Sequence, residues 1–532
     1  MTTTTLLLWL VLAGPAALLA LAALPATDPK RLAGLARGGA LISLCSAAIA
    51  ALLVALGGPL ATPALPGIGI LFDALTAVMF LLVSFVGSIV VLFSRNYLAG
   101  DPGHSRFTRL LSGTLASVLL LILSGNMAMF LAAWVATSIG LGQLLVFYSD
   151  RPAAILAARK KFIASRLGDL CLAVAIALLW QATGTLEFTG LFAALKGVAA
   201  AGETPASLSI AAVLIAAAAL LKSAQFPLHG WLTEVMETPT PVSALLHAGI
   251  INAGGFLALR FSPLLQLSTP SMDLLLVVGG FTALFASVVM LTQNAIKVAL
   301  AWSTIAQMGF MLLQCGLGAW PAALLHIVAH SLYKAHAFLS SGSVVDIARA
   351  SWSPSPGGAP HPARLGLAVV GVLAGVAIVG SLSGFDLGRE PGLFALGAIL
   401  LMGLTHYIAQ SIDTRPTGFV IARTVMGAAV VAGLWFAVQA GMAAVMAGTL
   451  PQGAYRTDAA ALAAIAVVVA SFAVLTVFQA SFITAKPAKD GVAATPEWAR
   501  AFYVHAHNGL YVNALANRLV LRLWPTGLPT RR

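Results

Sequence analysis

Residues 221–247 read Leu-Lys-Ser-Ala-Gln-Phe-Pro-Leu-His-Gly-Trp-Leu-Thr-Glu-Val-Met-Glu-Thr-Pro-Thr-Pro-Val-Ser-Ala-Leu-Leu-His. They follow an apolar run from Leu208 that would be an ordinary membrane helix if it did not end in Lys222. Pro227 removes a backbone donor and clashes one turn back, so a helix through this stretch must kink or break. A charged side chain at bilayer depth costs about 2.5–3.5 kcal/mol, and such residues usually mark ion or proton pathways. The stretch therefore predicts a broken transmembrane helix at 207–235 that carries an ion-handling site.

Four more ionisable residues in the same stretch are candidates for proton transfer. Glu234 and Glu237 lie at the end that we expect to face the cytoplasm, where a proton would enter. His229 and His247 are suited to relay protons between these carboxylates and Lys222, because imidazoles titrate near neutral pH.

The composition identifies an integral membrane protein. The 532 residues are 60% hydrophobic and 9% charged, with a mean hydropathy of +0.96, whereas ordinary globular proteins are about 25% charged. The net charge of +12 is then explained by basic loops on the cytoplasmic side rather than by nucleic-acid binding. The three cysteines stand far apart in apolar runs, which favours neither a disulfide framework nor a metal site.

Apolar runs of spanning length predict about 13 to 15 transmembrane helices. The first follows Met1 and four threonines without a basic segment, so we expect a first span rather than a cleaved signal. Alternating sides from there collects most of the 29 Lys and Arg residues on one side, which predicts an outside N-terminus and a cytoplasmic C-terminus. The runs lie near 5–26, 38–57, 68–94, 107–124, 125–148, 161–182, 207–235, 240–260, 273–293, 297–317, 320–345, 363–383, 392–412, 420–447 and 458–484.

A second polar cluster consists of His326, His330 and Lys334. The i, i+4, i+8 spacing places all three on one face of an otherwise apolar helix. One buried histidine is more often structural, but three ionisable groups on one face favour a proton or ion path. A metal site at the two histidines is the rival interpretation, and the cation Lys334 next in the row argues against it.

Asp169 follows Arg166 by three residues near the start of the span at 161–182. The two side chains can form a local ion pair. Alternatively, Asp169 modulates the charge of Lys222 from a neighbouring helix. Asp73 is expected to cap the helix that follows it.

The C-terminal tail is amphipathic. From Trp498 to Trp524, apolar residues recur every four positions while Asn513, Asn517 and arginines occupy other faces. Such a helix lies on the membrane surface, packs on a partner subunit, or folds back on its own bundle, and these alternatives remain open. The sequence contains no nucleotide-binding glycine motif and no cysteine cluster for iron–sulfur, so we expect no cofactor or metal in this chain.

Three motifs carry a family resemblance. They are Lys-Ser-Ala-Gln-Phe-Pro-Leu-His-Gly-Trp-Leu (222–232), Pro-Thr-Pro-Val-Ser-Ala-Leu-Leu-His-Ala (239–248) and Ala-Trp-Ser-Thr-Ile-Ala-Gln-Met-Gly (301–309). They resemble the proton-translocating, antiporter-like subunits of respiratory complex I and Mrp sodium/proton antiporters. The resemblance implies an all-α polytopic membrane protein with two inverted five-helix repeats and discontinuous helices. It also implies proton transfer by Lys222, His247, Asp169, His326, His330 and Lys334.

These repeats give a predicted division of the chain. N-terminal transmembrane helices occupy 1–100, the first repeat 101–260 and the second repeat 261–412. Further transmembrane helices occupy 413–484, and the cytoplasmic amphipathic tail occupies 485–532.

The chain departs from the complex I and Mrp pattern in two places. The family's glutamate after a tryptophan is replaced here by Val135 after Trp134, and the second broken helix lacks its lysine in the stretch Ser381 to Asp386. Lys222 must therefore find a counter-charge elsewhere, first at Asp169 and then at Glu234 or Glu237. The altered charges, the shorter length and the tail look most like the DabB group of inorganic carbon accumulation subunits.

That resemblance implies a cation-conducting transporter subunit, not itself an enzyme, in the bacterial inner membrane. Its partner would be a large cytoplasmic, zinc-containing, carbonic-anhydrase-like subunit. Ion flow through the membrane subunit would drive the hydration of CO2 to bicarbonate in that partner. One alternative is a proton-translocating module of a complex I-like or Mrp-type antiporter. Another is a scaffold that anchors a partner, with a polar axis that no longer conducts.

Overall fold

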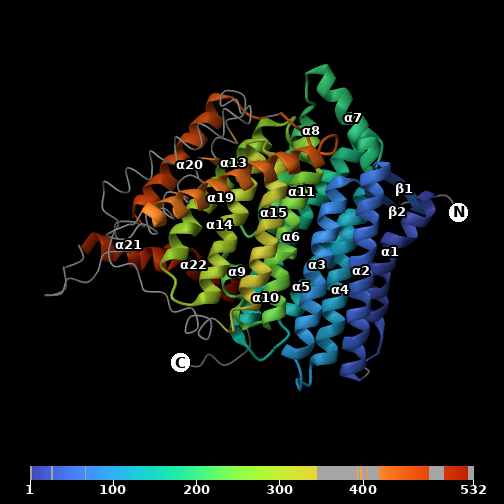
Figure 1. Ribbon diagram of the computed structural model, residues 1–532, viewed down its shortest axis with the longest axis horizontal. Coiled ribbons are helices and arrows are strands. Elements are labelled where there is room, and N and C mark those ends of the chain that lie inside the picture. The colour runs from blue at the N-terminus through green and yellow to red at the C-terminus, as the bar shows by residue number, and fades with distance from the viewer. Residues whose placement is uncertain are drawn as a thin grey trace.

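The computed structural model describes residues 3–25, 28–65, 68–343, 392, 396–397, 404, 418–453, 455–478 and 497–524. Within these ranges the chain is a bundle of long helices (Figure 1), and nine of the helices are long and apolar enough to cross a membrane. The protein is therefore a multi-pass membrane protein, as its composition indicates. The predicted spans at 363–383 and 392–412, and the stretch Ser381 to Asp386, lie outside the described residues apart from isolated positions.

The N-terminal part contains four long helices and a β-hairpin that the sequence analysis did not predict. The helices are α1 (Thr3–Ala23), α2 (Pro29–Gly57), α3 (Ala74–Tyr97) and α4 (His104–Leu123). Strands β1 (Leu60–Leu65) and β2 (Ile68–Phe72) pair antiparallel between α2 and α3. The predicted span at 68–94 thus begins as a strand, because α3 starts only at its N-cap Asp73.

The next four helices are α5 (Met127–Leu145), α6 (Pro152–Thr183), the short α7 (Phe188–Ala201) and α8 (Ala206–Lys222). Of these, α5 and α6 supply the neighbours of Lys222 at the end of α8. Asn126 caps α5 by accepting a hydrogen bond from the Ala128 backbone nitrogen at 2.8 Å, and its amide donates to Glu187 at 2.9 Å. This contact ties the start of α5 to the residue that precedes α7.

The predicted break at 207–235 is confirmed. Helix α8 ends at Lys222, and Ala224 has a φ of +52°, a left-handed backbone that a non-glycine residue rarely adopts. The chain then forms only the short turns α9 (Gly230–Thr233) and η1 (Val235–Glu237). A second interruption, which we did not predict, divides 240–260 into α10 (Thr240–Ala248), η2 (Ile250–Asn252) and α11 (Ala253–Arg260), followed by α12 (Ser262–Leu265).

The remaining described helices complete the bundle and its tail. The long helices are α13 (Thr269–Leu291), α14 (Ile296–Gly316), α15 (Trp320–Leu339), α19 (Gly418–Val445) and α20 (Ala459–Phe478). The tail consists of α21 (Glu497–His507), η4 (Gly509–Tyr511) and α22 (Val512–Leu523). Figure 1 shows α21 and α22 crossing the bundle near one end of α13 and α14.

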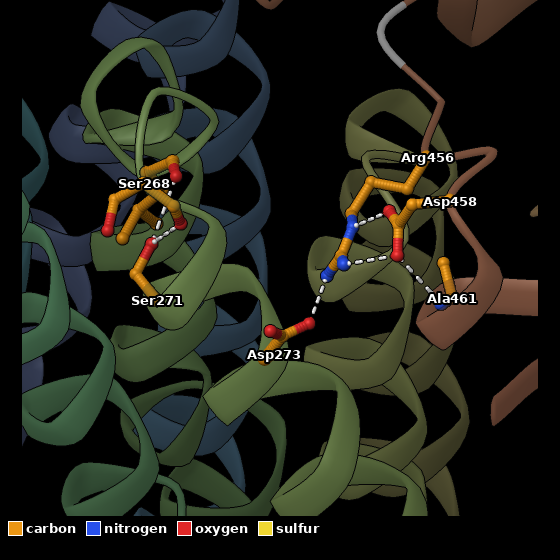
Figure 2. A network of polar contacts seen from close by, with 7 residues as sticks. Ser268, Ser271, Asp273, Arg456, Asp458 and Ala461 are labelled. Atoms are coloured by element: carbon orange, nitrogen blue, oxygen red, sulfur yellow. Dashed lines mark hydrogen bonds and ion pairs between the residues drawn. The ribbon is translucent and has the colours of Figure 1, made fainter. Parts of the chain in front are cut away.

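Arg456 fastens α20 to α13, as Figure 2 shows. Its guanidinium contacts Asp273 at 2.6 Å and Asp458 at 2.8 and 2.9 Å. Asp458 also accepts from the Ala461 backbone nitrogen at 3.1 Å, at the start of α20. The hydrogen bond from Arg456 lowers the pKa of the Asp458 carboxyl.

A buried ion pair joins α3 to α11. Asp73 accepts from the Thr76 backbone nitrogen at 2.8 Å, which confirms its predicted capping role. The same carboxylate binds Arg260 at 2.5 and 3.2 Å, and Arg260 also donates to the Thr76 hydroxyl at 2.6 Å. Arg260 is only 2% exposed.

We predict that Asp73→Asn strongly lowers the thermal stability of the purified protein in detergent. Breaking one side of a buried pair leaves an uncompensated charge and costs about 3–5 kcal/mol. Asp458→Asn is the matched control, because its pair with Arg456 is half exposed and such pairs are worth about 0–1 kcal/mol. Equal shifts of the two melting temperatures would contradict the assignment of Asp73 and Arg260 as a structural pair.

Candidate ion-pathway site

Lys222 is held by α5 rather than by a carboxylate. Its side chain is 7% exposed, and its Nζ donates to the Ser138 hydroxyl at 2.6 Å and to the Trp134 carbonyl at 3.3 Å. The ammonium also lies 4.2 Å from the centroid of the Trp134 ring, a cation–π distance. Lys222 is the last residue of α8, where the helix dipole favours a positive charge.

A second buried lysine meets Lys222 at the same residue. The Nζ of Lys161, on α6, donates to the backbone carbonyl of Ser138, while Lys222 binds the hydroxyl of Ser138. Lys161 is 5% exposed and is an electrostatic neighbour of Lys222. Neither Ser138 nor this role of Lys161 was predicted from the sequence. A Ser one turn after Trp134 on a predicted span was the available signal.

Asp169 is not the direct counter-charge that we had expected for Lys222. Its carboxylate pairs with Arg166 at 2.6 Å, which is the local i, i+3 pair also considered from the sequence. Asp169 still lies within electrostatic range of Lys222 and Lys161. Three cations therefore share one carboxylate in this part of the bundle.

Glu234 and Glu237 also pair with other cations. Glu237 binds Arg151 at 3.0 Å, and Glu234 binds Lys160 at 2.6 Å. Both expected alternatives for the counter-charge of Lys222 are therefore engaged elsewhere. The reason is the break itself, which carries these carboxylates away from the end of α8 to the start of α6.

His229 lies in an aromatic cage. Its ring is 0% exposed and lies 5.7 Å from the Phe226 ring, 5.7 Å from the Phe285 ring and 5.0 Å from the Trp302 ring, measured between centroids. Within the described residues, neither ring nitrogen has a hydrogen-bond partner. Its relay role stays a prediction.

His247 and Lys334 form a second station with α14. The Nδ1 of His247 lies 3.0 Å from the Thr304 hydroxyl, and its ring stacks on Phe338 with centroids 4.2 Å apart. The Nζ of Lys334, fully buried on α15, donates to the Leu300 carbonyl at 3.0 Å. His330 is an electrostatic neighbour of both. We had grouped His247 with Lys222, whereas the structure places it beside Lys334 and His330, because α10 packs against α15.

His326 and His330 follow each other on the same face of α15 as Lys334. Their ring centroids lie 6.2 Å apart, and both border a cavity of about 590 Å³ between α14, α15 and α19. Gln307, Gln314 and Gln439 add polar groups to its wall. The rest of the lining is mostly apolar, so the cavity offers a water molecule only a few polar partners.

We predict that Ser138→Ala destabilises the protein through Lys222. A hydrogen bond to a buried charge contributes about 1.5–3 kcal/mol, and the change removes the shortest one made by Lys222. The matched control is Thr137→Val, because the buried Thr137 hydroxyl bonds only to Ala133 of its own helix among the described residues. The melting temperature should fall clearly for Ser138→Ala and much less for Thr137→Val.

A double variant tests the same contact. The double variant Ser138→Ala/Lys222→Met should lose less stability than the sum of the two single changes, because without the Lys222 ammonium the loss of the Ser138 hydroxyl leaves no buried charge without this partner. Additive losses would show that Ser138 stabilises the bundle independently of Lys222.

Comparison with known families supports an antiporter-like subunit. Residues 124–351 match the family described as NADH:quinone oxidoreductase/Mrp antiporter, TM, and residues 66–108 match the family described as NADH-Ubiquinone oxidoreductase (complex I), chain 5 N-terminus. The fold is similar to solved structures of an Mrp complex from Dietzia (TM-score 0.56, 24% identity, 99% of this chain and 57% of that chain). It is also similar to the archaeal membrane-bound sulfane sulfur reductase (TM-score 0.57, 19% identity, 97% of this chain and 99% of that chain).

Two relatives identify the group to which the chain belongs within this larger family. The chain is 40% identical over 454 residues to the "Probable inorganic carbon transporter subunit DabB2" of Halothiobacillus neapolitanus, covering 85% of this chain and 80% of the relative. It is 36% identical over 459 residues to the "Probable inorganic carbon transporter subunit DabB" of Hydrogenovibrio crunogenus, covering 86% and 84%. The chain therefore belongs to the family of DabB inorganic carbon transporter subunits, within the larger group of complex I and Mrp antiporter-like subunits.

Proposed function

We propose that this chain is the proton-conducting subunit of an energy-coupled inorganic carbon accumulation complex. The observation that carries the proposal is the pair of buried lysine stations, at Lys222 and at Lys334, in a relative of DabB subunits. Keeping two ammonium groups inside a membrane bundle is costly. Both lysines are held inside the bundle by hydrogen bonds, which supports a role in ion transfer.

The proposed orientation places the C-terminus and the Glu234 end of the bundle in the cytoplasm of a bacterial inner membrane. The basic residues near the start of α6 and in the tail gather at this end, in agreement with the positive-inside rule. A proton would enter near Glu234 and Glu237 and pass His229 to reach Lys222. The second station, formed by His247, His330, His326 and Lys334, would continue the path.

The proposed partner is a large cytoplasmic, zinc-containing, carbonic-anhydrase-like subunit. Zinc lowers the pKa of its bound water to about 7 and so supplies a hydroxide for attack on CO2. Each bicarbonate formed from CO2 and water releases one proton. A membrane subunit that moves protons can therefore bias the hydration in one direction.

A second candidate function rests on the other relatives. The chain is 39% identical over 279 residues to the "NAD(P)H-quinone oxidoreductase chain 5" of a Synechocystis species, but covers only 41% of that protein. A module of a complex I-like or Mrp-type antiporter would relieve salt sensitivity without a zinc-containing partner. The first function predicts no such effect.

We predict that co-expression with the partner restores growth in air of a bacterial strain that lacks carbonic anhydrase. Lys222→Ala combined with Lys334→Ala should abolish the rescue, because both stations lose the group that carries the proton. The matched control is Lys196→Ala, which removes an exposed lysine on α7.

Membrane levels of each variant, measured by immunoblot, distinguish loss of transfer from loss of protein. Full rescue by the double variant at normal membrane levels would overturn the proposed conduction. It would leave the chain as a scaffold that anchors the partner.

A further inference from the structure

The tail helix α22 lies against the break that follows α8. Asn513 and Asn517, one turn apart on α22, both donate to the same Glu234 oxygen, at 2.6 and 2.8 Å. The contact joins residues nearly 280 positions apart in the chain. Of the three alternatives for the amphipathic tail, the structure thus shows α22 folded back on its own bundle.

Lys160 closes a ring with the same groups. Its Nζ pairs with the other Glu234 oxygen at 2.6 Å and donates to the Asn513 side-chain oxygen at 2.6 Å. The Lys160 side chain is 6% exposed and that of Glu234 is 20% exposed. Both oxygens of the carboxylate are engaged, so a proton reaching Glu234 must first displace one of these contacts.

Gly230 is the residue that lets α22 approach so closely. A Cβ at this position would lie 2.0 Å from the Asn513 side-chain oxygen and 2.7 Å from its Cγ. Lys160 also reaches the Gly230 carbonyl at 3.4 Å. Any larger residue at 230 would push Asn513 away from Glu234.

The tail is fastened on both sides of this contact. At one end, Gln293 donates to the His507 carbonyl at 3.0 Å, and the Nδ1 of His507 lies 2.9 Å from the Thr292 carbonyl. At the other end, Arg159 donates to the Trp524 carbonyl and lies 4.8 Å from the Trp524 ring centroid. These anchors hold α22 in register across the mouth of the break.

We propose that α22 is a cap over the cytoplasmic mouth of the Lys222 pathway, with Asn513 and Asn517 as positioning residues that hold Glu234 against Lys160. This inference rests on the proposed function and adds a way in which proton access to the Lys222 pathway is regulated. With the ring closed, both oxygens of Glu234 are engaged and its side chain is only partly exposed. When α22 lifts, the carboxylate loses two donors and can exchange protons with water.

Hydrogen–deuterium exchange on the full-length protein in nanodiscs tests the contact. Asn513→Ala, Asn517→Ala and Gly230→Ala should each raise the exchange of residues 230–237 by about tenfold, because each removes or displaces a hydrogen bond to a charged group. Asn508→Ala is the matched control, because its amide bonds only to Val504 within the tail among the described residues. Unchanged exchange in all three variants would overturn the cap.

Proton flux into liposomes that contain the full-length chain tests the regulation. The three variants should admit protons severalfold faster than the parent protein, and Lys222→Ala in the same chains should abolish the increase. An increase that persists without Lys222 would be an unspecific leak and would overturn the proposal. Faster hydrogen–deuterium exchange at 230–237 without any increase in proton flux would also overturn it. Growth rescue by the parent protein is measured separately, so the cap can fail while the proposed function stands.

Discussion

The structure depends on how a buried ammonium is accommodated without a carboxylate beside it. Lys222 ends α8, where the backbone carbonyls of the last turn favour a cation. The Ser138 hydroxyl, the Trp134 carbonyl and the Trp134 ring supply the remaining interactions. All three come from one turn of α5, so the packing of α5 against α8 decides whether the charge can be kept in the bundle.

The buried groups of the second station are also held by neutral oxygens rather than by a carboxylate. Lys334 donates to a backbone carbonyl of α14, and His247 binds the Thr304 hydroxyl of the same helix. Neutral oxygens hold a proton carrier more weakly than a carboxylate does, because an ion pair adds a Coulomb attraction that must be overcome at each transfer. The carboxylates of Asp169 and Glu234 are instead paired with Arg166 and Lys160.

Features encoded locally could be predicted from the sequence. Pro227 predicted the break, because a proline removes a backbone donor and clashes with the preceding turn. His326, His330 and Lys334 could be placed on one face because helical spacing alone decides it. The hairpin at 60–72 was missed because β2 continues into the apolar run of the span predicted at 68–94. The hydrogen bond between Lys222 and Ser138, and the pairing of Asp73 with Arg260, could not be derived, since both depend on which helices pack together.

The tail shows the same division between local and distant information. Its amphipathic pattern predicted a helix but left open the surface that it covers. The structure selects the bundle because α22 presents two amides at i and i+4 to a single carboxylate, opposite a glycine that leaves room for them. The opposite face of α22 exposes Leu515, Leu519 and Leu523. The polar face is thus used for the intramolecular contact, and the apolar stripe is left on the side away from Glu234. Any contact that moves α22 from its apolar side also moves Asn513 and Asn517, and therefore the hydrogen bonds that hold Glu234 against Lys160.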